Sequence, residues 1–241
     1  MIASFHIAEV GPRAGLRLLS RPPKPRAVPG LRFAATLSTG PLNAAIPPRP
    51  SISRIALVAF WEREDALDEF LAGHPVAAAL AGGWHARLEP VRHVGAFHEL
   101  ADLPRGEPMS ADEPVAILTL GRARFDRLVP FMRANARAAG VAAANPALLA
   151  STGFLRPPRL VGTFSVWRTT AAMRAYATGR PDPAHRDAIV ADREKPFTHE
   201  KMFIRFRPYA AVGRWDAVEP LTTAVTPQLS AEPRGVEPQR A

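Results

Sequence analysis

Hydrophobic residues along this chain follow two alternating periods, one typical of strands and one typical of helices. Apolar runs predict two sets of four strands, at 2–9, 31–39, 54–61 and 84–97 and then at 114–121, 148–155, 159–167 and 200–208. Apolar residues at helical spacing predict helices between them, at 13–20 and 62–78 and then at 125–140, 169–177 and 184–194. The 84–97 run predicts one long strand with a bulge near Pro90.

The two sets repeat one pattern, β-α-β-β-α-β. Residues 57–75 align with residues 162–181, which places Trp61 opposite Trp167. Each half has the order of a ferredoxin-like unit. We therefore predict an α+β fold in which two fused ferredoxin-like βαββαβ repeats form, within one chain, the α/β barrel that dimers usually make. In such a fold the two tryptophans occupy equivalent positions.

Composition divides the chain into four parts. The first half covers 1–100 and carries a basic N-terminal arm. Polar, turn-forming residues at 101–113 predict a linker to the second half, which covers 114–216. Residues 217–241 are rich in Pro, Thr and Gln without periodicity, which predicts a disordered tail.

The absence of cysteine excludes several kinds of chemistry. With Cys 0 in 241 residues, disulfides, thiolate nucleophiles, iron–sulfur clusters and Cys-ligated zinc are ruled out, so a metal would need His or carboxylate ligands. The N-terminus has no basic region of the kind that begins a secretory signal, and no apolar run reaches about 18 residues. We expect a cytoplasmic protein.

Positive charge is concentrated at the N-terminus. The formal net charge is +9, and residues 1–54 carry eight Arg or Lys against Glu9 alone. Leu16, Leu18 and Leu19 lie among these cations, which suits peripheral contact with an anionic membrane as well as a solvated loop. The run RPPKPR would also suit a polyproline II ligand. Aromatic residues are not interleaved, so nucleic acid is not an expected partner.

Simple motifs do not define a catalytic site. The chain has no GxGxxG, Walker loop or GxSxG, and HEKMF at 199–203 has Phe203 where a zincin motif needs its second His. A zinc site would have to use His85, His93 and His98. The densest group of candidates lies in 163–207. There His185 and Arg193 share one predicted helix, and arginines such as Arg193, Arg205 and Arg207 can bind anionic groups bidentately.

The residues of this region carry a family resemblance. The string TFSVWRTTAAMRAYA (163–177), followed by His185, Arg193-Glu194, Phe197-Thr198 and Arg205-Phe206, resembles the spheroidene monooxygenase family of carotenoid-modifying enzymes, as does PGLRFAATLSTG (29–40). The resemblance implies a haem-dependent monooxygenase that uses O2 and electrons from ferredoxin to introduce a keto group into acyclic carotenoids. It also implies His185 as the axial ligand of the iron, and Arg193 and Arg205 as contacts of the haem propionates.

The apolar substrate would need a slot beside the cofactor. We expect this slot to be lined by large apolar residues, with Trp167 and Phe203 also contacting the cofactor; the candidates are Trp61, Phe164, Trp167, Met202 and Phe203. Two other functions stay open. One is a non-catalytic α/β-barrel protein that binds an apolar ligand. The other is a cofactor-free oxygenase or dehydratase that uses His185 as a general base.

The ligand assignment predicts that His185→Ala loses haem, or shifts its Soret band, while the fold persists, because the axial imidazole is removed. His199→Ala is the matched control and should change neither property, since His199 begins a predicted strand and can face solvent. Absorption spectra of the purified variants, with circular dichroism for the fold, provide the measurement. An unchanged haem content and spectrum in His185→Ala would contradict the assignment.

Overall fold

The computed structural model describes residues 1–40, 51–127, 130–131, 142, 144–178 and 195–218. The predicted helix at 184–194, most of the one at 125–140 and residues 219–241 of the predicted tail lie outside these residues. The described strands are β1 Ile2–Glu9, β2 Leu31–Gly40, β3 Ser51–Trp61, β4 Trp84–Ala96, β5 Val115–Ala123, β6 Leu148–Arg156, β7 Leu160–Trp167 and β8 Thr198–Val212. The described helices are α1 Pro12–Ser20, α2 Glu64–Gly73, α3 Pro75–Leu80 and α5 Thr170–Thr178, with short 3-10 helices η1 His98–Leu100 and η2 Phe125–Arg127.

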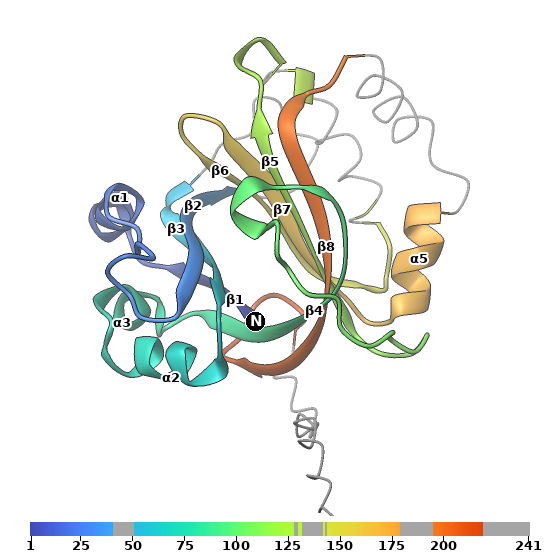
Figure 1. The fold of residues 1–241 in the computed structure, drawn as a ribbon, viewed down its shortest axis with the longest axis horizontal. Helices are drawn as coiled ribbons and strands as arrows, with labels where there is room; N and C mark the ends of the chain where they lie inside the picture. Colours follow the sequence, from blue (N-terminus) through green and yellow to red (C-terminus); the bar gives the residue numbers. More distant parts are fainter. Residues whose placement is uncertain (41–50, 128–129, 132–141, 143, 179–194, 219–241) are drawn as a thin grey trace, which may run out of the picture.

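The strands form one closed barrel in the order β1-β3-β2-β6-β7-β5-β8-β4. Within the first half the order is β4-β1-β3-β2, and within the second it is β8-β5-β7-β6. Each half therefore has the same ferredoxin-like order, and the pairs β2–β6 and β4–β8 join the halves (Figure 1). The predicted fold is confirmed.

Trp61 and Trp167 occupy equivalent positions, as the repeat predicts. Trp61 ends β3 and lies opposite Ile2 and Leu31, whereas Trp167 ends β7 and lies opposite Val115 and Leu148. Each indole packs against a ring on the following helix, Phe70 at 4.9 Å for Trp61 and Tyr176 at 5.0 Å for Trp167. The rings are nine residues from their tryptophans in both halves.

Side chains fill the interior of the barrel. Phe5 and Phe164 stack with ring centroids 3.8 Å apart, and Trp84 and Trp215 pack beside them. Phe97 and Leu100 from the η1 region enter the same core. A barrel of eight strands is just wide enough for side chains to fill it, so this interior is a packed core.

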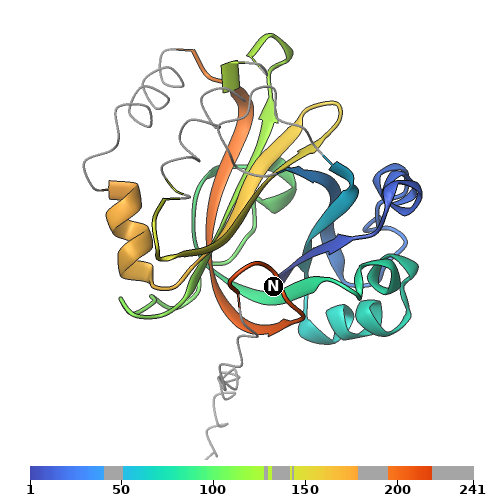
Figure 2. The same ribbon diagram turned by 180° about the vertical axis from the view of Figure 1, so that it is seen from behind.

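The helices cover the outside of the barrel. Figures 1 and 2 show α1, α2 and α3 on one side and α5 on the opposite side. The single helix expected over 62–78 is two helices, because Pro75 cannot donate a backbone hydrogen bond and disfavours helical backbone at His74. His74 Nδ1 accepts a hydrogen bond from the backbone N–H of Val76 instead, at 3.1 Å. None of the described helices is long and apolar enough to cross a membrane.

The segment at 101–113 is packed against both halves. Leu103 is buried in the barrel core, and Met109 is buried in a separate cluster on the outer face of the second half. At the other end of the second half, Val218 is still buried and forms an isolated bridge with Trp215. These contacts hold the segments that flank the second half against the barrel.

A buried histidine lies between β1 and the helices of the first half. His6 is 2% exposed, and its Nε2 lies 3.0 Å from Ser4 Oγ, which in turn accepts a hydrogen bond from the Trp61 indole at 2.9 Å. The His85 ring stacks on His6 with centroids 5.2 Å apart. Burial, together with the nearby His85 and Arg87, lowers the pKa of His6 from 6.5 to about 3. The folded protein therefore holds His6 neutral.

This burial predicts a loss of stability in mild acid. Below about pH 6.5 the unfolded chain takes up a proton at His6 that the folded chain excludes until about pH 3, so stability falls as the pH falls through this window. We expect His6→Gln to make the free energy of unfolding less dependent on pH by about 1.4 kcal/mol per pH unit between pH 6 and about pH 4.

The measurement is urea unfolding across this pH range. His199→Gln is the matched control, because His199 is exposed on β8, and it should keep the wild-type slope. A His6→Gln protein with the wild-type slope would contradict the assignment.

Candidate functional site

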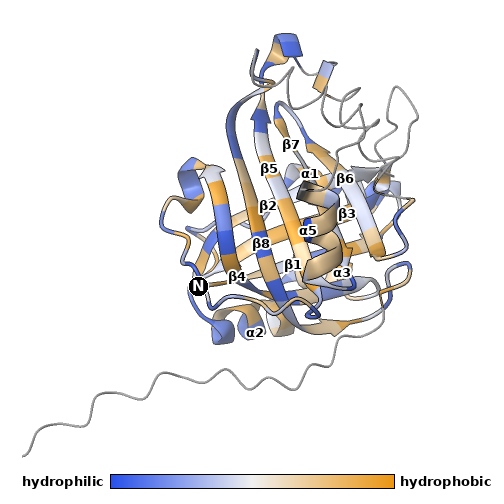
Figure 3. Cartoon of the chain, turned by 90° about the vertical axis from the view of Figure 1, so that its right-hand side faces the viewer, coloured by the Kyte–Doolittle hydropathy of each residue, from blue (hydrophilic) through white to orange (hydrophobic). Residues whose placement is uncertain are grey.

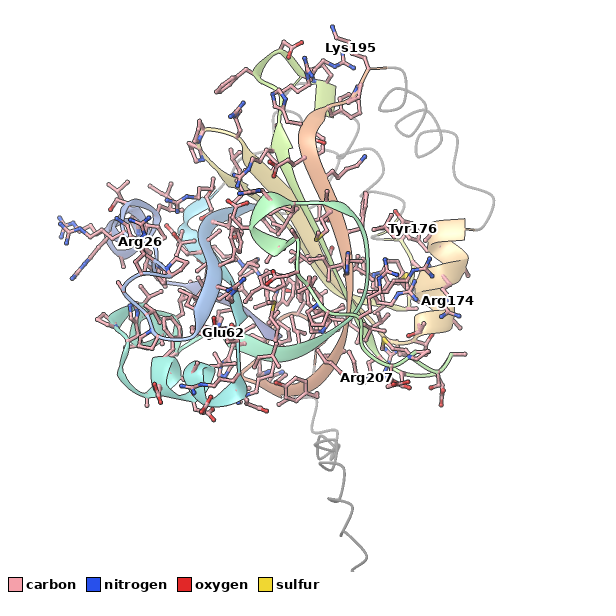
Figure 4. All side chains as sticks on the ribbon, in the orientation of Figure 1. Arg26, Glu62, Arg174, Tyr176, Lys195 and Arg207 are labelled. Atoms are coloured by element: carbon pink, nitrogen blue, oxygen red, sulfur yellow. The ribbon has the colours of Figure 1, made fainter. Side chains whose placement is uncertain are left out.

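A cavity of about 540 Å³ lies on the outer face of the second half, between β4, β8, α5 and the 101–113 segment. This volume falls within the range of about 300–1,000 Å³ that is usual for small-molecule sites. Among the described residues that line it, four are arginines and none is acidic; the arginines are Arg92, Arg105, Arg174 and Arg205. Figure 4 shows nitrogen-bearing side chains gathered between α5 and β8, beside the labelled Arg174.

A bulge in β4 places Arg92 in this cavity. The pairing of β4 with β8 has one irregularity between Arg87 and Leu88 and is then regular to Pro90, which lies opposite Phe206. It shifts again by one residue after Pro90, so that Arg92 lies opposite Arg205. Without the shift Arg92 would lie opposite Ile204, whose side chain is in the barrel core. The bulge expected near Pro90 is therefore confirmed, and it turns a charged side chain outward, as bulges beside functional sites often do.

Gly95 permits the close approach of the two strands beyond the bulge. Its φ is +90°, in the region that favours glycine, and a Cβ there would lie 2.1 Å from the carbonyl oxygen of Lys201. The bulge also reverses the parity of the histidines on β4. His85 lies opposite the exposed Val212, whereas His93 lies opposite the buried Ile204, so these two do not share a face. Among the described residues no group of three His, Asp or Glu could hold a metal ion.

Arg92 and Arg205 are like charges directly opposite each other, an arrangement that normally destabilises a sheet. Burial lowers the pKa of Arg205, and the charges of Arg174 and Arg92 lower it further. The Nε of Arg205 is buried and has no hydrogen-bond partner. Because a buried donor without a partner is costly, this guanidinium is suited to an anion from outside the chain.

The neighbouring rungs of β4 and β8 differ sharply from this one. On one side Arg207 lies opposite Glu89 and donates to it at 2.7 Å, and it also donates to Glu113 at 2.9 Å. Arg207 is therefore held by acids of the chain. On the other side Val94 lies opposite Phe203, and both are exposed, at 58% and 43%. The face thus runs from a neutralised pair, through two like charges that form no ion pair with a described acidic side chain, to an exposed apolar pair. Figure 3 shows that β8 carries both polar and apolar residues along its length.

The predicted site residues fall into distinct regions. Arg205 and Phe203 lie on the outer face just described, and Trp167 packs in one apolar cluster with Val91 and Met109, which line the cavity. Their roles toward a cofactor stay predictions. His185 and Arg193 lie outside the described residues.

The predicted apolar slot is not one site. Phe164 and Met202 are buried inside the barrel, whereas Trp61 is buried under α2 on the outer face of the first half. Trp167 and Phe203 are on the outer face of the second half. Alternation along a strand separates two sets of side chains but does not say which set faces the barrel core. The sequence therefore did not distinguish the core residues among these candidates from those on the outer face.

Sequence reasoning missed Arg92, Arg105 and Arg174 as members of the site. Arg174 lies within the resembling string at 163–177, so its position was available. Arg92 depends on the bulge, because an unbroken strand would turn it toward the core. Arg105 lies in a segment whose polar composition suggested only a linker.

Comparisons with known proteins identify relatives of this chain. The chain is 35% identical over 199 residues to a spheroidene monooxygenase from Rubrivivax gelatinosus, covering 78% of this chain and 72% of that protein. It is 28% identical to one from Rhodobacter capsulatus, covering 84% and 86%, and 23% identical to one from Cereibacter sphaeroides, covering 78% and 59%. A comparison with models of protein families finds no match.

Among solved structures, an aldoxime dehydratase aligns with a TM-score of 0.48 and 10% identity over 86% of this chain and 80% of that one. An anthrone oxidase-like protein aligns with a TM-score of 0.36 and 13% identity over 93% and 96%. The strand order and the named sequence relatives place the chain in the class of monooxygenases with a ferredoxin-like barrel. Within that class it belongs to the spheroidene monooxygenase family.

Proposed function

We propose that this protein is a haem-dependent monooxygenase that oxidises an acyclic carotenoid, or another long apolar substrate, with O2 and electrons from a reduced ferredoxin. The observation that carries the proposal is the 35% identity to a spheroidene monooxygenase over most of both chains. The cationic cavity and its apolar edge support it, because they combine the two kinds of surface that such a cofactor needs.

The residues of the cavity fit a haem group. The propionates of haem are carboxylates, and the unpartnered Nε of Arg205, beside Arg92, is a suitable donor for them. Phe203 and Val94 present exposed apolar surface next to these cations, suitable for the flat apolar part of the cofactor or for substrate. A bound haem would supply reductive activation of O2, the part of the chemistry that amino-acid side chains do not perform.

The protein's own contribution is binding, orientation and exclusion of water. Arginines that hold the carboxylates fix one edge of the cofactor, and the cluster of Val91, Met109 and Trp167 gives an apolar wall from which water is excluded. In each turnover one oxygen atom enters a C–H bond of the substrate and the other leaves as water, which consumes two electrons and two protons. The first turnover gives an alcohol, and a second at the same carbon gives a gem-diol that loses water to leave the ketone. We propose His185 as the axial ligand on the family resemblance alone.

We expect turnover of spheroidene by the full chain after reconstitution with haem, given ferredoxin, ferredoxin reductase, NADPH and O2. The product should be a ketone in which one oxygen replaces two hydrogens, and the oxygen should come from labelled O2, as mass spectrometry can show. Binding of the carotenoid without turnover would favour the non-catalytic binding protein. Turnover by protein stripped of haem would favour the cofactor-free oxygenase.

We also propose that the protein works in peripheral contact with an anionic membrane, where a long apolar substrate would be dissolved. The surface that suits this contact surrounds α1. Leu16 is 63% exposed there, and Ile52 beside it is 49% exposed. Five exposed cations surround them and make no ion pair with a described acidic side chain, namely Arg13, Arg17, Arg21, Lys24 and Arg26. In Figure 4 the labelled Arg26 points away from the barrel.

This surface predicts binding to anionic vesicles that weakens as salt rises, because exposed charges are screened over about 8 Å at physiological ionic strength. Each cation replaced by Gln, for example Arg17→Gln or Arg21→Gln, should weaken vesicle binding about five-fold. Arg63→Gln is the control, since Arg63 is exposed on the α2 side and pairs with Asp65. Co-sedimentation is the measurement. Equal binding to neutral and anionic vesicles, or no dependence on salt, would contradict the prediction.

A further inference from the structure

The internal repeat allows equivalent positions of the two halves to be compared. Ser4 of β1 and Ile117 of β5 are equivalent, because each lies two residues after the position opposite its tryptophan. Arg87 lies opposite Ser4, and Arg205 lies opposite Ile117. Arg87 of the first half and Arg205 of the second are therefore the same position of the repeat.

In the first half this arginine is neutralised by the chain. Arg87 donates to Glu64 at 2.9 Å and also to Asp68, both on α2, and these contacts raise its pKa against the effect of burial. Glu64 lies three residues after Trp61, and Asp68 lies seven residues after it. Side chains of α2 thus supply both counter-charges.

In the second half both counter-charges are gone. The residues three and seven positions after Trp167 are Thr170 and Arg174, so an acid has become a hydroxyl and the other acid has become a third cation. Thr170 donates its hydroxyl to the carbonyl of Glu113 and does not replace the lost partner. Burial and the charges of Arg174 and Arg92 lower the pKa of Arg205. Its Nε is buried and has no hydrogen-bond partner among the described residues.

We infer that the cavity on the outer face of β4 and β8 is a dicarboxylate-binding site, in which the ligand supplies the negative charges that α2 supplies in the first half. Arg205 and Arg92 bind the carboxylates, and Phe203 and Val94 carry the apolar body of the ligand. The inference rests on the proposed function for the identity of that ligand, haem, and it locates the cofactor outside the packed barrel, against the second half.

The pattern of charges favours this ligand over a simple inorganic anion. A phosphate would need only the cations, whereas the exposed Val94–Phe203 pair adjoins them on the same face at the next rung. The apolar pair lies between cations, since the Lys201 amine lies over the Phe203 ring at 5.4 Å on the side away from Arg205, and the rung toward Arg207 is already neutralised by Glu89 and Glu113. A flat apolar molecule with acidic groups along one edge matches both features.

The test uses metal-free protoporphyrin IX and its dimethyl ester as fluorescent probes with the full chain. Without iron neither probe depends on an axial ligand, and the ester lacks the two carboxylates. We expect the diacid to bind at least ten-fold more tightly than the ester, and Arg205→Gln to remove that difference. Arg63→Gln, an exposed arginine on the α2 side, is the control and should bind as the wild type does.

A second variant gives the second half the acid that the first half has at the equivalent position. Arg174→Asp restores an acid seven residues after Trp167, so Arg205 can pair within the chain as Arg87 does. We expect this variant to lose diacid binding at least ten-fold. Arg205→Gln should unfold at the same temperature as the wild type or higher, because it removes a like charge and an unpartnered buried donor.

Three results would overturn the site. They are equal binding of diacid and ester to the wild type, unchanged diacid binding in Arg205→Gln, and failure of both probes to bind. The proposed activity is tested separately by turnover of the carotenoid. Arginine-dependent binding of the diacid in a protein that never oxidises spheroidene would uphold the site and reject the activity.

Discussion

The pairing of β4 with β8 is the contact on which the rest of the structure depends. It runs from His85 opposite Val212 to Ala96 opposite Lys201 and, together with β2–β6, closes two half-barrels into one. Two open ferredoxin-like sheets would leave edge strands with unpaired backbone groups. Closure satisfies those groups and encloses a single apolar core. The same joint contains the bulge that turns Arg92 outward, so closure of the barrel and formation of the cavity have a common origin.

The duplication explains how one scaffold can carry both a stabilising half and a binding half. In the first half Leu67 and Phe70 of α2 are buried in one apolar cluster with Trp61, and Arg87 is neutralised by acids. In the second half the corresponding face keeps its tryptophan but carries Arg205, whose buried Nε has no partner among the described residues, and exposed apolar residues beside β4. A feature that costs stability in a folded chain, yet occupies a position where the other repeat satisfies it, points to a ligand more strongly than an isolated charged residue does.

Much of this architecture could be predicted from the sequence, for physical reasons that particular residues illustrate. The continuous apolar run of β3 and the alternation of Met202, Ile204 and Phe206 in β8 reflect burial that only a sheet provides, so their strands were clear. The repeat was visible in the sequence because a similar helical pattern follows each of Trp61 and Trp167. The break at Pro75 was missed because Ala77 and Ala78 continue the helical spacing across it. The packing of Leu103 and Met109 was hidden by the polar residues around them.

The functional face was harder to predict because it depends on register and on the loss of partners. Arg205 was a candidate because it is an arginine at a position that matches the family, but its proposed role depends on the side chains around it. Arg92 approaches it only because one extra residue in β4 changes the parity of the strand. Arg207 lies two residues further along β8, so the alternation of the strand places it on the same face as Arg205. It is nevertheless neutralised by Glu89 and Glu113. Of these two arginines on one strand face, only Arg207 is neutralised by acidic side chains in the part of the chain that the structure describes. The difference arises entirely from neighbours that are distant in sequence, which is why a site of this kind must be argued from the folded chain.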